Sequence, residues 1–198
     1  EVSELGDALG FVTGRDKPLA AYVFSEDPAS VIERAILTGA ITVPQDLGFF
    51  ETSMELAERV VSLAGVERSH SVLEPSAGTG RIARVAAKIT PDVDCIELLP
   101  VNARKLLDGR FARKLTIGDF LSVPANREYD RIVMNPPFEK QSDIRHVLHA
   151  LDFLKIGGLL VSIVAAGVRF RENKLAREFR DRVVSCGGWF EDLPEGSF

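Results

Sequence analysis

A strand that runs directly into a glycine-rich turn constrains the fold of this chain more than any other feature. Residues 71–74 are mostly apolar up to Glu74, a turn with Gly78 and Gly80 follows, and an alanine-rich helix comes next. Glycine permits the positive φ angles and close backbone approaches that such a turn requires. Gly78, Gly80 and Ala83 have the G-x-G-x-x-A spacing that opens a nucleotide-binding βαβ unit. The pattern predicts an open α/β sheet with a ligand site at the end of this strand.

Apolar runs alternate with helical patterns along the rest of the chain. Strands are predicted at 93–97, 114–121 and 129–134, separated by helices. The apolar run at 159–165 is typical of a central strand in a parallel sheet, and Trp189 begins one more predicted strand. Strands that alternate with helices indicate βαβ units. We therefore predict an α/β fold: a Rossmann-like, doubly wound, mostly parallel sheet with helices on both faces.

Acidic residues at three predicted strand ends indicate the kind of nucleotide. Glu74 would repel a pyrophosphate but attract an ammonium group, and the turn after it is longer than a usual dinucleotide turn. Glu97 follows 23 residues later, where an acid can accept hydrogen bonds from both ribose hydroxyls, although it could also be a solvated charge. Asp119 can accept from an adenine amino group while Phe120 packs against the ring. A nucleoside with a cationic amino-acid part fits these acids better than NAD does.

The predicted strand at 129–134 ends in the sequence Asn135, Pro136, Pro137 and Phe138. Proline has no N–H to donate, so the sheet stops there, and the residue before a proline is held in extended angles. A flat base with an exocyclic amino group can donate to the Asn135 amide oxygen and the Pro136 carbonyl while Phe138 stacks on it. Two acceptors would leave the nitrogen lone pair free to attack an electrophilic methyl group. The alternative is a plain strand exit in which the prolines only end the strand.

The region before the glycine-rich turn divides into two parts. Residues 1–48 are predicted to form a separate helical extension without chemistry of its own. Thr52 and Glu55 have capping-box spacing at the start of a second helix, which Gly65 ends. The ring of Phe50 just before this helix can flank a bound ligand, or it can simply pack.

The charge of the chain gives it no general affinity for nucleic acid. The formal net charge is −5, so contact with a phosphate backbone needs a local patch. Basic residues are dense between 169 and 182, where Lys174, Arg177 and Arg180 lie on the predicted outer face of a helix. Such a face is usually only solvated, but it is also the stretch most suited to meet phosphates.

The cysteines and histidines favour neither a disulfide nor a metal site. Cys95 and Cys186 lie far apart in sequence, which is typical of reduced thiols in a cytosolic protein. We find no apolar run as long as a membrane span and no signal peptide, so we expect a cytoplasmic protein that does not bind membranes. His146 and His149 lie three apart on a helix predicted at 144–154, and without a third ligand nearby a structural role is expected instead of zinc.

Together the motifs resemble those of the class I S-adenosylmethionine-dependent methyltransferases, in particular the amino-group DNA methyltransferases of adenine type. The matches run in family order from Phe50 to Phe198, about three quarters of the chain. The sequence at 50–52 is similar to the F-x-T-P cofactor motif, with Ser53 in place of proline. Residues 73–80 match the glycine-rich motif, and N-P-P-F is one of the catalytic forms of the family.

The resemblance implies a function for each motif. The cofactor would be S-adenosyl-L-methionine, and the reaction would be methyl transfer to N6 of adenine in DNA, as in restriction-modification systems, phages or mobile elements. The target base would have to leave its duplex. Residues 49–198 would be the catalytic domain. The cofactor residues would be Phe50, Thr52, Glu74, Ser76, Ala77, Gly78, Gly80, Glu97, Leu98, Asp119, Phe120 and Asn135, and the catalytic residues Asn135, Pro136, Pro137 and Phe138.

Two departures from the family keep other functions open. The final antiparallel strand of the family sheet has no counterpart after the strand predicted near Trp189, and no stretch is long enough for a target-recognition domain. We expect either a longer protein, in line with a chain that starts at Glu1 without methionine, or a separate specificity domain or subunit. The alternatives are an RNA base methyltransferase, a protein-glutamine methyltransferase, or a cofactor-binding module that docks on nucleic acid without turnover.

Overall fold

Parallel strands form the centre of the computed structural model, which describes residues 51–126 and 128–193. The expectations for residues 1–48 and for Phe50 lie outside this range. The described strands make one five-stranded sheet in the order β3-β2-β1-β4-β5, and every neighbouring pair is parallel. Their bounds are β1 Val72–Glu74, β2 Val93–Glu97, β3 Lys114–Ile117, β4 Tyr129–Met134 and β5 Leu154–Ser162. The predicted Rossmann-like α/β sheet is confirmed.

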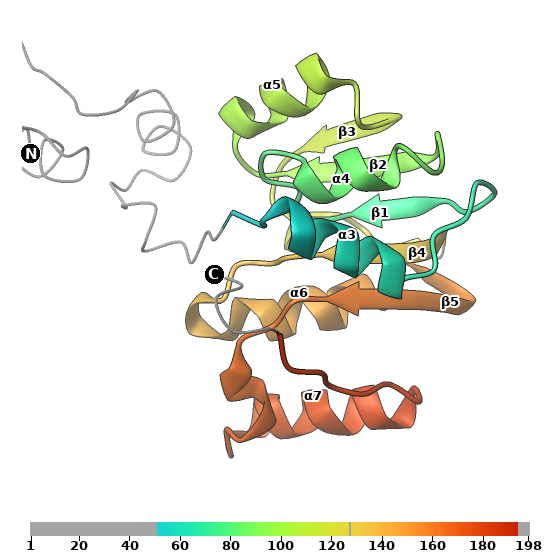
Figure 1. Ribbon diagram of the computed structural model, residues 1–198. Helices are drawn as coiled ribbons and strands as arrows, with labels where there is room; N and C mark the ends of the chain where they lie inside the picture. The colour runs from blue at the N-terminus through green and yellow to red at the C-terminus, as the bar shows by residue number, and fades with distance from the viewer. Residues whose placement is uncertain (1–50, 127, 194–198) are drawn as a thin grey trace, which may run out of the picture.

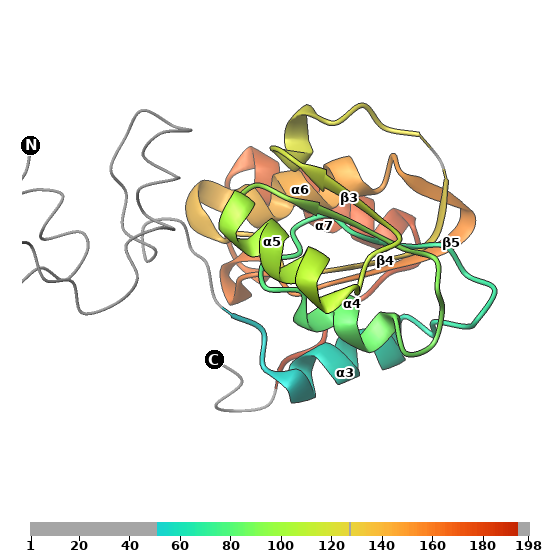
Figure 2. The ribbon, with the colours of Figure 1, turned by 90° about the horizontal axis from the view of Figure 1, so that it is seen from above.

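Helices cover both faces of the sheet because side chains on each strand alternate between the faces. Val72 and Val133 belong to a core cluster with α3 and α4, whereas Leu73 and Ile132 belong to a second cluster with α6 and α7. Figure 2 shows α3 and α4 on one side of the strands and α6 and α7 on the other. The bounds are α3 Met54–Leu63, α4 Arg81–Ala86, α5 Pro100–Gly109, α6 Ser142–Ala150 and α7 Lys174–Ser185.

All strands point the same way, which gives the sheet two chemically different edges. In Figure 1 the arrowheads point toward the side at which α3, α6 and α7 begin. We call this side the carboxyl edge and the opposite side the amino edge. Polar residues that follow the strands therefore gather at one edge, where ligands bind in open α/β sheets.

The start of α3 differs by one residue from the prediction. Ser53 caps the helix and its side chain accepts from the Leu56 N–H at 3.2 Å, so Thr52 is not the cap. The Thr52 hydroxyl accepts a hydrogen bond from Asn135 instead. The other end is as predicted, because Gly65 follows the helix with φ +54°, an angle that favours glycine.

Two strand predictions and one helix boundary in the last part of the chain are wrong. The run at 159–165 is not a central strand: β5 begins at Leu154, ends at Ser162 and pairs with β4 alone among the described strands. Ile156, which is 92% exposed, lies before this run, where the register between β4 and β5 shifts. An apolar run shows that a strand is partly buried, but it does not show on how many sides the strand is paired. The helix predicted at 144–154 ends four residues earlier, at Ala150: a turn at 151–153 follows it, and β5 begins at Leu154.

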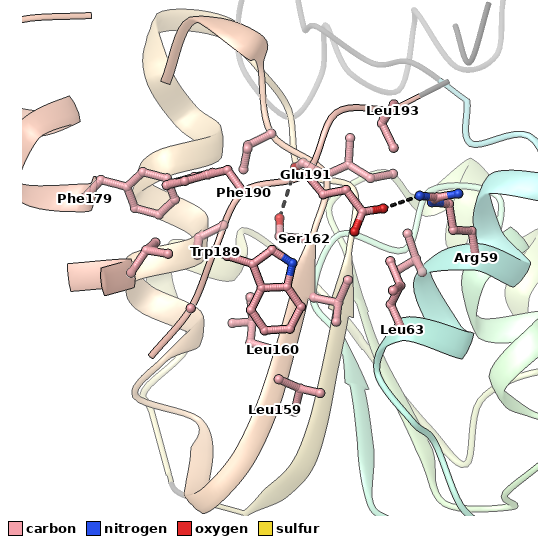
Figure 3. A pocket seen from close by; sticks show the side chains of 17 residues that line it. Arg59, Leu63, Leu159, Leu160, Ser162, Phe179, Trp189, Phe190, Glu191 and Leu193 are labelled. Atoms are coloured by element: carbon pink, nitrogen blue, oxygen red, sulfur yellow. Dashed lines mark hydrogen bonds and ion pairs between the residues drawn. The ribbon is translucent and has the colours of Figure 1, made fainter. Parts of the chain in front are cut away.

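The strand predicted at Trp189 is not formed within the described residues. The segment 189–193 has no ladder partner; instead the Phe190 ring packs edge-on against Phe179 at 5.9 Å, and Glu191 pairs with Arg59 on α3. In Figure 3 this segment crosses beside β5, with Trp189 over Leu159 and Leu160 and with Glu191 turned to Arg59. Side-chain contacts to α3 and α7 therefore hold this segment in place of backbone pairing.

Candidate cofactor and target-base site

Three segments that are distant in sequence meet in one small pocket at the carboxyl edge. The pocket has a volume of about 20 Å³. Its lining residues come from the segment before α3, the end of β1 with its glycine-rich turn, and the end of β4: Glu51, Thr52, Glu74, Ser76, Ala77, Gly78, Thr79, Arg81 and Asn135. The structure thus brings together six of the predicted cofactor residues, one of which is Asn135, the first residue of N-P-P-F.

The glycine-rich turn takes backbone angles that require glycine. Gly78 has φ +55° and Gly80 has φ +82°, and Gly80 is the N-cap residue of α4. A Cβ added at Gly80 would lie 2.3 Å from Cδ2 of Leu106. This turn can therefore keep its shape, with its amides close to a ligand, only if these glycines are present.

Glu74 is an acid buried at the end of β1. Its side chain is 2% exposed, and Oε2 accepts from the Ala83 N–H at 2.7 Å. Burial raises the pKa of Glu74 well above its usual value, and the nearby Glu97 raises it further, whereas the Ala83 hydrogen bond lowers it. Because burial of an uncompensated carboxylate is unfavourable, a cationic group in this pocket would stabilise the ionised form.

Glu97 connects the end of β2 to the glycine-rich turn. One carboxylate oxygen accepts from the Gly78 N–H at 2.6 Å, and the other accepts from the Leu99 N–H at 2.8 Å and from Asn102 Nδ2 at 3.4 Å. Burial raises the pKa of Glu97, and these hydrogen bonds oppose that rise. Glu97 therefore shapes the turn directly, a role that the sequence did not indicate. Its contact with ribose remains a prediction, as does that of Leu98, whose side chain is exposed.

Asp119 and Phe120 lie beyond β3 and point in different directions. Asp119 is exposed and caps the short 3-10 helix Phe120–Ser122, accepting from the Leu121 N–H at 3.0 Å. Phe120 is 3% exposed and packs in the core against His149 and Phe153, at 4.8 and 5.2 Å between ring centroids. Its predicted contact with adenine therefore remains a prediction, and what the structure gives Phe120 is a packing role under α6.

The N-P-P-F turn leaves β4 beside the end of β5. The Met134 carbonyl accepts from the Ile163 N–H at 3.0 Å, and Asn135 Nδ2 donates to Thr52 Oγ1 at 3.0 Å. Pro136 is buried, and Phe138 is half-buried against the core cluster of α3 and α4. The turn is thus fixed on both sides, with the Asn135 amide held at the pocket.

Sequence reasoning missed a polar cluster at the mouth of the pocket. Glu51 pairs with Arg81 at 2.8 Å and accepts from the Thr79 hydroxyl at 2.9 Å. Arg81 also donates to the carbonyl of Thr52 at 3.2 Å. The position of Arg81 directly after Gly80 was the available signal, since a side chain at a helix start points toward the pocket; Glu51 gave none.

The basic residues of α7 are partly committed to contacts within the protein. Lys174 and Arg177 are exposed, and each lies within 4.0 Å of a glutamate carboxylate. Arg180 does not lie on the outer face as predicted: it is half-buried and donates to the carbonyls of Val168 and Arg171 at 2.8 and 2.7 Å. Arg180 therefore anchors the chain before α7.

The histidines of α6 have structural partners. His149 Nε2 lies 3.0 Å from the Val123 carbonyl, and His146 Nδ1 lies 2.8 Å from the Ser142 carbonyl. Burial lowers the pKa of His146. Within residues 51–126 and 128–193, no cluster of three or more His, Cys, Asp or Glu side chains is arranged to hold a metal ion. No helix in the same ranges is long and apolar enough to cross a membrane.

A larger cavity of about 230 Å³ lies away from the motifs, between α3, β5 and α7. Its walls are mostly apolar and include Leu63, Leu160 and Trp189, as Figure 3 shows. None of the predicted cofactor or catalytic residues lines it. Because the charged and polar groups converge at the smaller pocket, we place the functional site there despite its size.

Comparisons with known proteins show the family of the chain. The family model of the methyltransferase small domain matches residues 53–187. The tRNA1(Val) (adenine(37)-N6)-methyltransferase of Aliivibrio fischeri is 31% identical over 83 residues, which cover 38% of this chain and 36% of that protein. The match thus spans about a third of the length of this relative.

Solved structures share the fold at lower sequence identity. The protein PH1948 from Pyrococcus horikoshii superimposes with a TM-score of 0.56 at 23% identity, over 81% of this chain and 78% of that chain. The M protein of the type I restriction enzyme EcoKI gives a TM-score of 0.57 at 16% identity, over 71% of this chain and 38% of that chain.

Proposed function

Because this chain belongs to the methyltransferase small domain family and uses S-adenosyl-L-methionine, we propose that it methylates N6 of adenine in nucleic acid, with DNA as the first candidate. The observation that carries this proposal is the position of Asn135. Its side chain lines the same pocket as Glu74 and the glycine-rich turn. A target amino group held by Asn135 would therefore lie beside the cofactor.

The residues of the pocket fit the cofactor. When bound, S-adenosyl-L-methionine supplies an activated methyl group. Glu74 would face the amino group of the methionine part, which offsets the cost of its burial. The carboxylate of the methionine part would lie beside the glycine-rich turn, and Glu97 and Asp119 would hold the ribose and adenine. The pocket of about 20 Å³ has room for about one water, so exposed side chains at its mouth must move on binding.

The N-P-P-F residues would bind and orient the target base. The Asn135 amide oxygen and the Pro136 carbonyl accept from the exocyclic amino group, and the Phe138 ring packs on the base. These acceptors favour a nitrogen whose lone pair points at the methyl group. Catalysis then depends mainly on orientation and on preorganised polar groups.

RNA is the second candidate substrate, and a specific finding favours it. The curated relative from Aliivibrio fischeri acts on adenine in a tRNA, and its match with this chain is 31% identical. The M protein of EcoKI, which belongs to a restriction enzyme, supports DNA at the level of the fold alone. For either substrate we propose residues 49–198 as the catalytic domain and a further domain or subunit as the source of sequence specificity, as in a restriction-modification system.

Contact with the phosphate backbone is proposed for the exposed end of α7. Lys174 and Arg177 are exposed there, and the phosphates of a nucleic acid can displace their glutamate partners, because exposed ion pairs contribute at most about 1 kcal/mol. Arg180 is omitted, since its guanidinium is held by backbone carbonyls.

Methyl transfer from labelled cofactor to DNA, RNA and protein tests the proposal directly. We expect label in a nucleic acid and N6-methyladenine after its digestion, and we expect the Asn135→Ala variant to lose the label. Label confined to protein, or transferred equally well by Asn135→Ala, would refute the proposal. Label in RNA but not in DNA would replace the first candidate by the second.

A further inference from the structure

We infer that Thr52 is a positioning residue. It determines which atom of the Asn135 amide, Oδ1 or Nδ2, faces the target base. The Thr52 hydroxyl oxygen accepts from Asn135 Nδ2 at 3.0 Å. This bond holds the amide nitrogen toward the start of α3 and the amide oxygen away from it. The inference deepens the proposed function and rests on it, because it assigns a part to Thr52 in the same methyl transfer.

The local structure explains why Thr52 is available for this contact. Thr52 is 8% exposed and directly precedes the cap of α3, and Ser53 performs the capping. The hydroxyl of Thr52 is therefore not used by the helix next to it. It reaches across 83 positions of sequence to the end of β4, so the contact is a tertiary one.

The chemistry of an amide makes its orientation decisive. The side chain of asparagine has one oxygen that only accepts and one NH₂ group that only donates. The amino group of a base donates, so it must meet the oxygen. A rotated amide would place two donors against each other and leave a partly buried polar group unsatisfied. The Thr52 hydroxyl can donate as well as accept, so it selects the productive orientation once its own hydrogen is donated to another partner and only its acceptor lone pair faces Asn135.

The cluster at the pocket mouth holds Thr52 in place. Arg81 donates to the Thr52 carbonyl at 3.2 Å and pairs with Glu51 at 2.8 Å, and Glu51 accepts from Thr79 at 2.9 Å. Arg81 and Thr79 belong to α4 and to the glycine-rich turn. Thr52 is therefore connected through its backbone to the cofactor loop and through its hydroxyl to the target-binding turn.

A hydroxyl that accepts from Asn135 keeps its own hydrogen for another partner. Thr52 lines the pocket predicted to hold the methionine part of the cofactor. Its O–H can donate to the cofactor carboxylate while its oxygen holds Asn135. A bound cofactor would then order the Thr52 hydroxyl and, with it, the amide that presents the target.

A purely structural role for Thr52 would affect stability and not kcat. Three variants distinguish this role from a positioning role. Thr52→Val keeps the shape but removes the acceptor, and Thr52→Ser keeps the hydroxyl. Thr90→Val is the matched structural control: Thr90 is fully buried before β2, donates to the His70 carbonyl at 3.0 Å and accepts from the Asp92 N–H at 3.1 Å.

At saturating cofactor we expect Thr52→Val to lower kcat about tenfold, the scale of one misplaced hydrogen bond. Thr52→Ser should recover most of the rate. Thr90→Val should lower the melting temperature and leave kcat unchanged. The inference would be overturned by a normal kcat in Thr52→Val, or by a kcat in Thr52→Ser as low as that of Thr52→Val.

A second measurement does not depend on methyl transfer. The asparagines of the chain are Asn102, Asn126, Asn135 and Asn173, so the side-chain amide of Asn135 can be assigned by NMR with an Asn135→Asp variant. We expect its two amide protons to be well separated in shift in the wild type, to converge in Thr52→Val and to stay apart in Thr52→Ser. Unchanged Asn135 signals in Thr52→Val would refute the contact whatever the substrate is. Changed signals in a protein that transfers no methyl group to nucleic acid would instead reject the proposed function and leave the contact standing.

Discussion

The acids at the two edges of the sheet are stabilised in opposite ways. At the amino edge, Asp94 accepts from Arg113 Nε and Nη2 at 3.0 and 2.7 Å and from the Tyr129 hydroxyl at 2.9 Å. Asp130 accepts from Lys155 at 3.0 Å. Hydrogen bonds lower the pKa of Asp130. Those from Ser71 have the largest effect, and the one from Lys155 has a smaller effect.

At the carboxyl edge, Glu74 and Glu97 accept from backbone N–H groups, with Asn102 as a weak addition. No basic side chain of the described chain lies within ion-pair distance of either carboxylate. Burial raises the pKa of both acids. The amino edge thus neutralises its charges within the protein, whereas the carboxyl edge keeps two that a ligand can neutralise. Glu74 also lines the pocket, and an uncompensated acid at such a place favours a functional site.

The largest contrast between the edges is expected in methyl transfer. Asn135→Ala at the carboxyl edge should lower the rate on the order of a hundredfold, as for loss of one preorganised polar group, and leave cofactor affinity unchanged. Tyr129→Phe at the amino edge removes a hydrogen bond to Asp94 and should cost about 1 kcal/mol of stability with the rate unchanged. Single-turnover kinetics and calorimetry on both variants make the comparison. Normal methyl transfer by Asn135→Ala would show that the chemistry takes place elsewhere.

A smaller contrast is expected in cofactor binding. Glu74→Gln keeps the shape of the side chain but cannot pair with an ammonium group, so affinity should fall about ten- to a hundredfold. Because the pKa of Glu74 is raised in the free protein and an ammonium ligand favours the ionised form, wild-type binding should release protons and strengthen as pH rises through that pKa. Calorimetry in buffers of different ionisation enthalpy measures the release. Equal proton release by the wild type and Glu74→Gln would mean that another group is linked to binding.

The sequence predicted the parts of the carboxyl edge that depend on local patterns. The strand before Gly78, the angles of that turn and the position of Asn135 at a strand end follow from residue type and spacing, and the structure has them. Contacts across the fold could not be predicted in this way. The bond between Thr52 and Asn135 joins segments 83 positions apart, and the burial of Phe120 depends on how α6 packs. Nothing local in the sequence specifies either.

The same limit applies to the last strand. Apolar runs report burial, and β5 is partly buried by the helices on its faces although, among the described strands, it pairs with β4 alone. Trp189 and Phe190 have residue types typical of strands, but they contact side chains on β5 and α7 and form no ladder with any described strand. Pairing depends on which neighbours are present in space, and a local pattern does not contain that information.

The smallest contrast is expected in the pH dependence of stability, and its sign should differ between the edges. Asp130 has a lowered pKa in the folded protein, so its contribution to stability is present above its unfolded value, about 3.9, and is lost as pH falls through the folded value. Lys155→Met should therefore lower the free energy of unfolding at pH 7 by up to about 1 kcal/mol, and the difference should shrink in acid. Lys105→Met on the exposed side of α5 is the matched control, because Lys105 makes no ion pair with a described residue.

Glu74 at the carboxyl edge has a raised pKa, so its contribution to stability is present below its unfolded pKa and is lost as pH rises through the folded pKa. Relative to Glu74→Gln, the wild type should therefore gain stability as pH falls. Urea unfolding between about pH 2 and pH 8 measures both slopes. If the two variants changed stability with the same pH slope, the difference between the two edges would not be electrostatic.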